Sequence, residues 1–437
     1  MSERRFGFRR SGSEVALSEE VFSFEDIPYR HAAGTELPLA HLRVHVAAAS
    51  KNKMMTSDVG RPMRPGAARA AVGIVFFING FGFATWVSRI PAVRDALTLS
   101  EGQLGTALFA LAAGALVAFP LAGRGTTIKG ARTVTVVSAI AYCLVLSGPG
   151  FAAGLGTLAL CLFFFGLASG AMDVAMNAIA VEVEDLIAKP IMSSLHGMWS
   201  AGGLAGAVTG SLFARQNVPV QTHLLIASAV LVATLVVAKR WLPASRVVAS
   251  DSSPHFVRPE AAMLGLGIIV FCSFLIEGAM ADWSAVLLRD SFATSEATAA
   301  LGYAAFSLAM MGMRFAGDRV VSHWNATSLL RWTNIVSALM FAAALWMLNI
   351  GLMMVALALV GIGVATVAPL VFRAAGKRSR SGAGHGIAAM ATLGYGGFLV
   401  GPPAVGWLAE ASSLRFALCV LVLLSFTIAA LAYHLKE

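Results

Sequence analysis

The chain contains twelve apolar segments, each about as long as the hydrocarbon core of a membrane requires. A membrane-spanning helix needs about 20 consecutive, mostly apolar residues. The segments lie near residues 69–88, 103–122, 133–149, 154–182, 190–213, 220–238, 262–286, 297–316, 329–348, 352–372, 384–408 and 415–433. They are continuously apolar rather than alternating, which excludes a membrane β-barrel, so helices must satisfy the backbone in lipid. The sequence predicts an all-α integral membrane protein with twelve transmembrane helices.

Composition excludes the soluble classes of protein. Hydrophobic residues make up 57% of the chain and charged residues 13%, whereas a soluble domain carries about 25% charged residues. The cysteines Cys143, Cys161, Cys272 and Cys419 lie far apart inside apolar segments, without the spacing of a metal site. We therefore expect no disulfide, no metal and no cofactor.

Lysine and arginine are distributed unequally between the two sets of loops. The loops on the side of the N-terminus hold fourteen of these residues, and the opposite loops hold five. Because cytoplasmic loops are enriched in Lys and Arg, we expect both termini in the cytoplasm. The net charge of +9 then follows from membrane topology, and we expect no nucleic-acid partner.

Polar stretches divide the chain into four parts. Residues 1–67 hold ten basic and eight acidic residues and no long apolar run. We expect them to form a disordered tail or an extension upstream of the true start, with a regulatory tail as the alternative. Six apolar segments lie in residues 68–239 and six in residues 262–437, separated by a polar loop at 240–261 that we expect to be cytoplasmic.

The two six-helix sets repeat each other in sequence. Three glycine pairs lie 194 positions apart: Gly123 with Gly317, Gly202 with Gly396, and Gly203 with Gly397. Ser100-Glu101 and Ser295-Glu296 follow the same shift to within one residue. This pattern predicts two parallel six-helix repeats.

The organisation resembles the major facilitator superfamily over residues 69–433. That superfamily carries the loop motif Gly-x-x-x-Asp-Arg-x-Gly-Arg-Arg, and the second half of this chain keeps its core as Gly317-Asp318-Arg319, preceded by Arg314. The equivalent first-half loop, 123–132, lacks the acidic residue. The resemblance implies a major facilitator fold of two six-helix bundles.

Three further strings resemble a narrower bacterial group, typified by the YbjJ inner-membrane protein and similar to the fucose:proton symporter branch. They are Glu277-Gly278-Ala279-Met280-Ala281-Asp282-Trp283-Ser284, Met172-Asp173-Val174-Ala175-Met176-Asn177 and Ser194-Leu195-His196-Gly197. The resemblance implies a proton-linked permease for a small solute in the bacterial inner membrane.

Ionisable residues inside the apolar segments are few. Burying a charge in a bilayer costs at least about 2.5 kcal/mol on insertion scales, so such residues are functional candidates. Asp173 and Glu277 lie deepest in their segments and in opposite halves, and we expect them to couple transport to protons. Asp282 lies nearer the external end of its segment, where it fits the water interface as well as a role in transport.

Polar residues recur at helical spacing beside these carboxylates. Asp173, Asn177 and Glu184 share one helix face, as do Ser273, Glu277 and Ser284, and also Asn79 and Trp86. We expect Asn79, Asn177, Trp86, Ser273, Ser284 and His196 to contact the solute in a shared cavity that Trp199, Tyr303 and Tyr395 can also line. An interhelical hydrogen bond, worth about 0.6 kcal/mol, is the alternative for the two asparagines. Packing is the alternative for the aromatic residues.

Charges of both signs lie where the cytoplasmic mouth is expected. We expect a gate there formed by Asp318, Arg319, Arg314, Glu182 and Glu184, with solvated loop charges as the alternative. The superfamily arrangement implies that Asp318 lies near the start of the fifth helix, at Pro190.

These features favour a secondary transporter that moves a small solute by alternating access, coupled to protons. The polar helix faces favour a polar or sugar-like solute. Efflux of amphipathic compounds and a transport-dead sensor or scaffold are the alternatives. No phosphate-binding loop, HExxH or GxSxG motif supports an enzyme, and we expect none. The expected partners are the solute, protons and the lipid bilayer, and we expect the protein to be monomeric.

Overall fold

The computed structural model describes residues 64–244, 260, 263–379 and 383–435, without the side chains of residues 318, 321, 322, 383 and 384. Within these residues the chain forms helices and no strand, as the apolar segments predict. The expected tail at residues 1–67 falls almost entirely outside them. Most of the expected loop at 240–261 does so as well.

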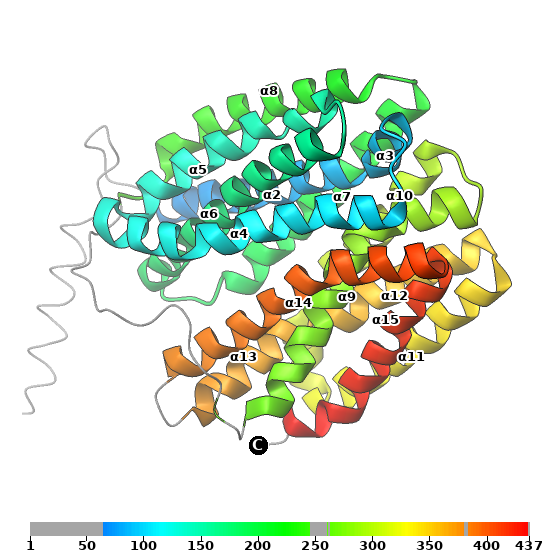
Figure 1. The fold of residues 1–437 in the computed structure, drawn as a ribbon. Coiled ribbons are helices and arrows are strands. Elements are labelled where there is room, and N and C mark those ends of the chain that lie inside the picture. The colour runs from blue at the N-terminus through cyan, green and yellow to red at the C-terminus, as the bar shows by residue number, and fades with distance from the viewer. Residues whose placement is uncertain (1–63, 245–259, 261–262, 380–382, 436–437) are drawn as a thin grey trace, which may run out of the picture. The chain divides into compact units, whose positions relative to one another are not determined.

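The first half of the chain supplies helices α2 to α8 (Figure 1). They are α2 Pro65–Val87, α3 Ile90–Ala96, α4 Glu101–Lys129, α5 Ala131–Val145, α6 Leu155–Ile187, α7 Met192–Arg215 and α8 Val220–Ala238, with single 3-10 turns at Gly148–Phe151 and Lys239–Trp241. Each of the six segments expected in this half coincides with a long helix. The short helix α3 is an addition, and it follows α2 directly.

The second half supplies helices α9 to α15 (Figure 1). They are α9 Leu264–Ser291, α10 Glu296–His323, α11 Ala326–Met347, α12 Ile350–Ala365, α13 Val367–Arg378, α14 Ala383–Ala411 and α15 Leu414–Leu431, followed by a 3-10 turn at Ala432–Leu435. The expected segment 352–372 is divided between α12 and α13. Pro369 has no N–H and its ring clashes with the carbonyl group of Ala365, so α12 ends at that residue.

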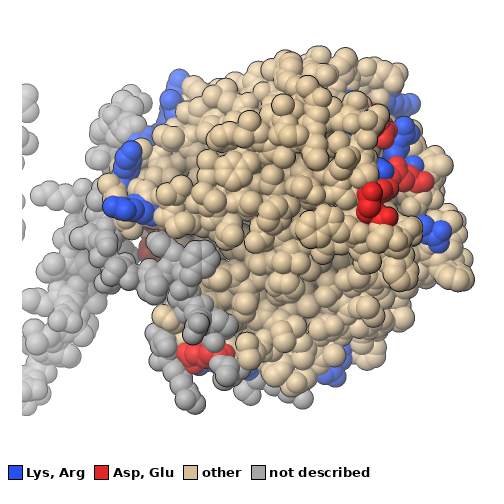
Figure 2. Space-filling model, viewed as in Figure 1, with Lys and Arg blue, Asp and Glu red and all other residues tan. Residues whose placement is uncertain are grey.

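The outer surface of these helices is apolar. Ten helical stretches among the described residues are long and apolar enough to cross a membrane; α7 and α14 are not among them. Large apolar side chains are exposed, including Leu121 at 64%, Val137 at 62% and Trp346 at 85%. Figure 2 shows that the charged side chains lie toward the two ends of the helices, with an uncharged surface between them. Such a surface is suited to lipid, and the protein is a multi-pass membrane protein.

Glycines bring the first and fifth long helices of each half into backbone contact. In α7, Gly202 lies against the carbonyl oxygen of Phe77 in α2, and in α14, Gly397 lies against that of Phe271 in α9. A Cβ atom at either glycine would clash with that oxygen. Phe77 and Phe271 are 194 positions apart, and the two glycines are 195 apart.

The second and fourth long helices repeat the same contact. Gly166 of α6 lies against the carbonyl oxygen of Leu111 in α4, and Gly361 of α12 lies against that of Phe306 in α10. Both positions differ by 195 between the halves. Small residues allow membrane helices to approach closely. The sequence repeat therefore corresponds to a repeat of helix packing.

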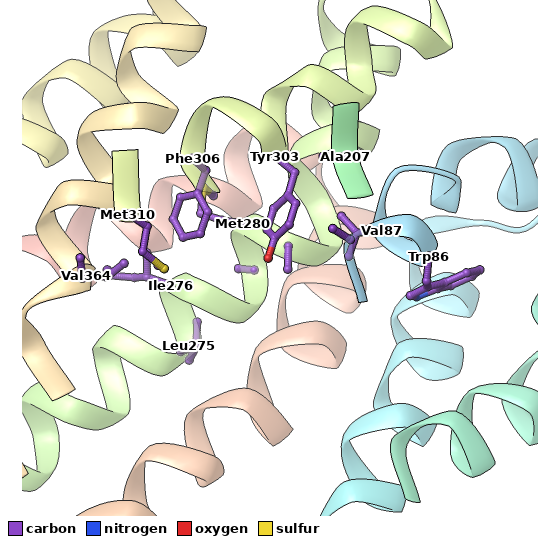
Figure 3. Close-up of a cluster of buried hydrophobic side chains, with 14 of the residues drawn as sticks. Trp86, Val87, Ala207, Leu275, Ile276, Met280, Tyr303, Phe306, Met310 and Val364 are labelled. Carbon is purple, nitrogen blue, oxygen red and sulfur yellow. The ribbon is translucent and has the colours of Figure 1, made fainter. Parts of the chain in front are cut away.

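The two halves meet mainly along α7 with α10 and along α4 with α14. On the first of these contacts, Gly203 of α7 lies against the side chain of Ser307 in α10. Figure 3 shows the buried apolar cluster at this interface, where Tyr303 of α10 lies next to Val87 and Ala207 of the first half. The core that joins the two halves is thus mostly apolar, and the few polar groups within it are candidates for a functional site.

Candidate functional site

The carboxyl group of Asp173 is hydrogen-bonded across the interface between the two halves. Tyr395 of α14 donates its phenol proton to Oδ2 of Asp173 in α6, at 2.5 Å. Asn177, one turn further along α6, donates from Nδ2 to Oδ1 at 3.1 Å. The rings of Phe119 and Phe274 pack against Tyr395. Asp173 therefore lies in an aromatic setting and links the first half to the second.

Glu277 of α9 is paired with a cation that also reaches the other half. Nη2 of Arg314 in α10 lies 3.3 Å from Oε1 of Glu277, which is 9% exposed. Nη1 of the same guanidinium donates to Oγ of Ser200 in α7 at 2.9 Å, and the Ser193 hydroxyl donates to the Arg314 carbonyl oxygen at 2.8 Å. The planar fork of an arginine can serve two acceptors at once. One side chain thus ties α9 and α10 to α7.

Aromatic and polar side chains of the first half adjoin Arg314. Its guanidinium carbon lies 5.7 Å from the ring centroid of Trp199, a cation–π contact. The Trp199 indole N–H donates to Oδ1 of Asn79 at 2.8 Å, while Nδ2 of Asn79 has no partner within the described residues. His196 lies within electrostatic reach of Arg314 and packs edge-on against Phe76.

The other predicted solute contacts lie within the helix packing. Trp86 and Ser284 are fully buried, and neither the Trp86 Nε1 nor the Ser284 Oγ finds a partner in the described part of the chain. Ser273 is also buried, and Asn177 bonds to Asp173 and its backbone carbonyl. The structure therefore brings Asn177 to Asp173 and His196 near Arg314, and joins Asn79 to Trp199. It places Trp86, Ser273 and Ser284 in packed surroundings.

A cavity of about 200 Å³ lies where α6 ends and α7 begins. It is lined by Arg69, Glu184, Pro190, Met192, Ser193, Ser194, Arg314 and Phe315. Two of the predicted gate residues, Glu184 and Arg314, therefore line it. Oε2 of Glu184 accepts the N–H groups of Ile191 and Met192 at 2.7 and 3.0 Å. A carboxylate at a helix N-terminus is stabilising, so Glu184 fixes the start of α7.

The other gate residues lie near this end of the helices. Glu182 is half-buried in α6, and Arg319 is exposed in α10. The side chain of Asp318 lies outside the described part of the structure. Pro190 and Phe315 line the same cavity, which places this part of α10 beside the start of α7. The expected contact of Asp318 with Pro190 stays a prediction.

At the opposite end, two Arg–Asp ion pairs join the halves reciprocally. Arg94 of α3 pairs with Asp290 of α9, and Arg289 of α9 lies 3.6 Å from Asp95 of α3. The two arginines are 195 positions apart, and so are the two aspartates. Each arginine also donates to the carbonyl oxygen five residues further along its own half. Each half thus presents an arginine to the aspartate of the other.

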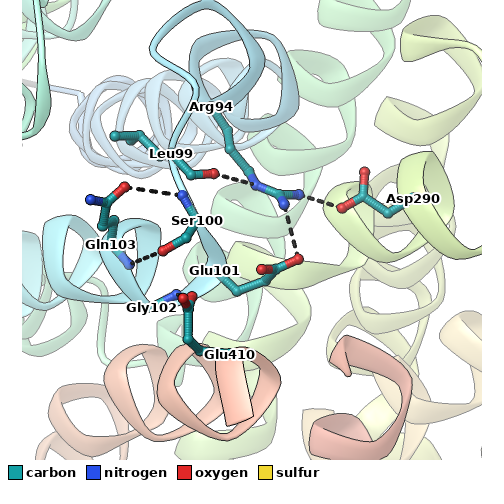
Figure 4. A network of polar contacts seen from close by, with 8 residues as sticks. All are labelled: Arg94, Leu99, Ser100, Glu101, Gly102, Gln103, Asp290 and Glu410. Atoms are coloured by element: carbon teal, nitrogen blue, oxygen red, sulfur yellow. Dashed lines mark hydrogen bonds and ion pairs between the residues drawn. The ribbon is translucent and has the colours of Figure 1, made fainter. Parts of the chain in front are cut away.

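Figure 4 shows Arg94 within a wider polar network. Its Nη2 lies 2.9 Å from Oε1 of Glu101, at the start of α4. Glu410, at the end of α14, accepts the backbone N–H of Gly102 at 2.9 Å. Arg89 lies 3.1 Å from Glu296 at the start of α10. The halves are therefore held together at this end by charge as well as by packing.

The sequence carries a signal for this network in its internal repeat. The repeat seen at Ser100-Glu101 and Ser295-Glu296 extends upstream to Arg94-Asp95 and Arg289-Asp290. In the structure, both serines cap the helices that they precede, α4 and α10. The sequence indicates Tyr395 only as an aromatic lining residue, because its partner Asp173 is 222 positions away.

Within the described residues, no group of three or more potential metal ligands lies together, and all four cysteines are free thiols. The chemistry of the buried groups is therefore that of carboxyl, guanidinium, phenol and amide side chains. Such groups can bind protons and polar solutes.

Residues 72–398 match the family described as the Major Facilitator Superfamily. The chain belongs to this superfamily. The uncharacterized transporter y4wD of Sinorhizobium fredii is 35% identical over 83% of this chain and 96% of that protein. An uncharacterized MFS-type transporter of Yersinia pestis is 33% identical, over 87% of this chain and 99% of its own length. The membrane protein MosC of Rhizobium meliloti is 32% identical over 82% and 88%.

Solved structures of major facilitator transporters share this fold. A variant of the nucleoside transporter NupG covers 85% of this chain and 100% of its own, with a TM-score of 0.67 and 13% identity. A bacterial homologue of the lysosomal transporter Spinster covers 84% and 95%, with a TM-score of 0.64 and 12% identity. Together with the family match and the transporter relatives, this likeness shows a membrane transporter of the major facilitator superfamily.

Proposed function

We propose that this transporter moves a small polar solute by alternating access, coupled to protons, in the bacterial inner membrane. The observation that carries the proposal is the hydrogen bond from Tyr395 to Asp173, because it places an acid at the contact between two halves. Asp173 is half-buried, and removing an ionised carboxylate from water without a cation is unfavourable. Asp173 therefore holds a proton most readily while it is shielded from water, and movement of the halves changes that shielding.

Glu277 differs from Asp173 because it has a counterion. Its pairing with Arg314 offsets much of the cost of burying both charges. We propose Asp173 as the proton carrier and the Glu277–Arg314 pair as the centre of the solute site. His196 and Trp199 adjoin Arg314, and Asn79 is bonded to Trp199. A hydroxyl group of the solute can replace Ser200 as an acceptor for Arg314. These contacts favour a polar or sugar-like solute over an amphipathic one.

The distribution of loop charges supports an orientation. By the positive-inside rule, the end with the cavity beside Glu184 is cytoplasmic, and the end with the Arg94–Asp290 pair is external. Both termini are then cytoplasmic. In this orientation the Arg–Asp pairs close the external side, so the structure corresponds to the state closed to the outside. Alternating access requires these pairs to separate in the other state.

The experiment compares accumulation with exchange in proteoliposomes. A thermal-shift screen of sugars, amino acids, organic acids and common drugs first identifies a solute. We expect Asp173→Asn to abolish accumulation driven by a pH gradient while preserving solute exchange. Glu277→Gln should reduce both activities together. Asp185→Asn, which removes an exposed carboxylate at the end of the same helix as Asp173, is the matched control. Accumulation by Asp173→Asn at the reference level would exclude Asp173 as the carrier.

A further inference from the structure

Helix α9 carries a second buried carboxyl group, five residues beyond Glu277 in the direction of Asp290. Asp282 is 7% exposed, and no hydrogen bond or ion pair reaches its carboxyl group from the described residues. Asp173 and Glu277 both have such partners. A buried polar group without a partner is rare in folded proteins and unfavourable when charged. Asp282 therefore needs an explanation beyond stability.

The internal repeat explains why Asp282 has no partner. Helix α9 follows α2 at a shift of 194, so Asp282 corresponds to Ser88 of the first half. The Ser88 hydroxyl donates to the carbonyl oxygen of Thr85 and lies against Gly210 of α7. The residue that corresponds to Gly210 in α14 is Val405, which is buried and apolar. The first half satisfies its polar group at the end of its helix, whereas the second half has an apolar residue at the position that corresponds to Gly210.

The charged groups on neighbouring helices are engaged elsewhere. Arg94 and Asp95 of α3 pair with Asp290 and Arg289, and Arg314 of α10 pairs with Glu277. Arg69 of α2 donates to Ser194, and Arg415 of α15 donates to a backbone carbonyl group. Glu410 of α14 accepts the backbone N–H of Gly102. The basic residues of α13 are Arg373, Lys377 and Arg378, in its second half. Within the described residues, the phenol of Tyr303 on α10 is the titratable group in electrostatic reach of Asp282, and it is in reach of Glu277 as well.

We propose that Asp282 is a second proton-binding site, reached from the external side. This inference rests on the proposed proton-coupled transport and on the proposed orientation. While the reciprocal Arg–Asp pairs hold the external side closed, the carboxyl group is protonated, because an ionised form would have no partner. When those pairs separate, water reaches Asp282. Its O–H bond then breaks, the carboxylate keeps the electron pair, and the proton passes to external water.

By linkage, the bound proton stabilises the closed state and its loss favours the open state. On α9, Asp282 stands five residues after Glu277 and eight residues before Asp290. Asp282 therefore lies between the external closure and the solute site along one helix.

Opening of the external side can be measured without a solute. Ser211 of α7 is 8% exposed, and its hydroxyl donates to the carbonyl oxygen of Ala297 in α10, at the external end. Ser211→Cys, in a protein whose four native cysteines are replaced by serine or alanine, reports separation of α7 and α10. A membrane-impermeant maleimide is added from outside at external pH values from about 5 to about 9. We expect the labelling rate to rise with pH, by up to about tenfold per pH unit.

Substitutions at Asp282 should change this profile in opposite ways. Asp282→Asn imitates the protonated form, so labelling should be slow and independent of pH. Asp282→Glu keeps a carboxyl group and should restore the pH dependence. Asp290→Asn weakens the external ion pair, and should speed labelling at every pH while keeping the slope. Thermal unfolding of each purified variant identifies any that fail to fold, and Asp282→Ser then takes the place of Asp282→Asn.

Two results would overturn the inference. The first is a reference protein whose labelling does not depend on pH. The second is an Asp282→Asn variant that keeps the reference profile. The proposed function is tested separately, because it fails if the reference protein cannot accumulate solute under a pH gradient. That assay and the labelling assay share no readout.

Discussion

The phenol of Tyr395 and the carboxyl group of Asp173 form a 2.5 Å hydrogen bond between α14 and α6, across the interface of the two halves. Helices that rock against each other must break this bond. The ring of Tyr395 is held by Phe119 and Phe274, so the hydroxyl can be removed without removing the packing.

Tyr395→Phe should therefore destabilise the closed state while leaving the fold intact. A buried acceptor that loses its donor costs about 1–3 kcal/mol, although Asn177 still donates to Asp173. We expect a lower melting temperature and faster labelling of Ser211→Cys from outside. Tyr433→Phe, which alters an exposed tyrosine, is the control. Equal melting temperatures for the two variants would show that the hydrogen bond contributes no stability.

The Glu277–Arg314 pair should behave as a unit. Glu277→Gln leaves the Arg314 guanidinium buried without its counterion, a loss of about 3–5 kcal/mol. The double variant Glu277→Gln/Arg314→Gln removes both charges and should be less destabilised than the sum of the single variants. Thermal unfolding in detergent measures all three. Additive effects would mean that the two charges do not interact in the folded protein.

Arg314→Lys tests the geometry of this pair rather than its charge. A lysine keeps the positive charge but cannot present two parallel N–H groups to Ser200 and Glu277. We expect the variant to fold and to bind the solute at least about tenfold more weakly, which corresponds to the loss of about 1.4 kcal/mol. Binding is measured by the thermal shift at several solute concentrations. Unchanged affinity would remove Arg314 from the solute site.

The reciprocal ion pairs should control opening of the external side. Arg94→Ala removes the partner of both Asp290 and Glu101, and labelling of Ser211→Cys should become several-fold faster, because partly exposed pairs contribute up to about 1 kcal/mol each. High salt should reduce the difference. Arg215→Ala is the control, since Arg215 is exposed at the end of α7. The exchange Arg94→Asp/Asp290→Arg should slow labelling again, and a failure to do so would argue against direct pairing.

Glycine packing gives a prediction about folding. A Cβ atom at Gly166 would clash with the carbonyl oxygen of Leu111, whereas a Cβ atom at Gly312 would meet nothing within 4 Å. Gly166→Ala should therefore separate α6 from α4 and lower the yield of folded protein. Gly312→Ala should be neutral or stabilising by up to about 1 kcal/mol, because alanine is the better helix former. Similar yields for both variants would contradict the close contact.

Much of the fold could be read from the order of residues alone. The free-energy cost of placing polar groups in lipid depends on each segment of the chain separately. Apolar runs in the sequence therefore predict where the membrane-spanning helices lie. Ser100 and Ser295 were visible in the sequence as part of the internal repeat, and in the structure both cap helices. Pro369 was equally visible, yet the division at Ala365 was missed because the surrounding residues are apolar throughout.

The hydrogen-bond and ion-pair partners of the buried polar residues could not be predicted from apolar runs. Asp173 and Glu277 are both carboxylates deep in apolar segments, and nothing local distinguishes them. Their difference arises because α10 brings Arg314 to one and α14 brings Tyr395, 222 positions away, to the other. Likewise, Arg94 meets Asp290 across 196 positions only because α3 and α9 pack together. Hydrophobic transfer depends on each segment separately, whereas hydrogen bonds and ion pairs require a few ångströms of proximity, and helix packing alone supplies that.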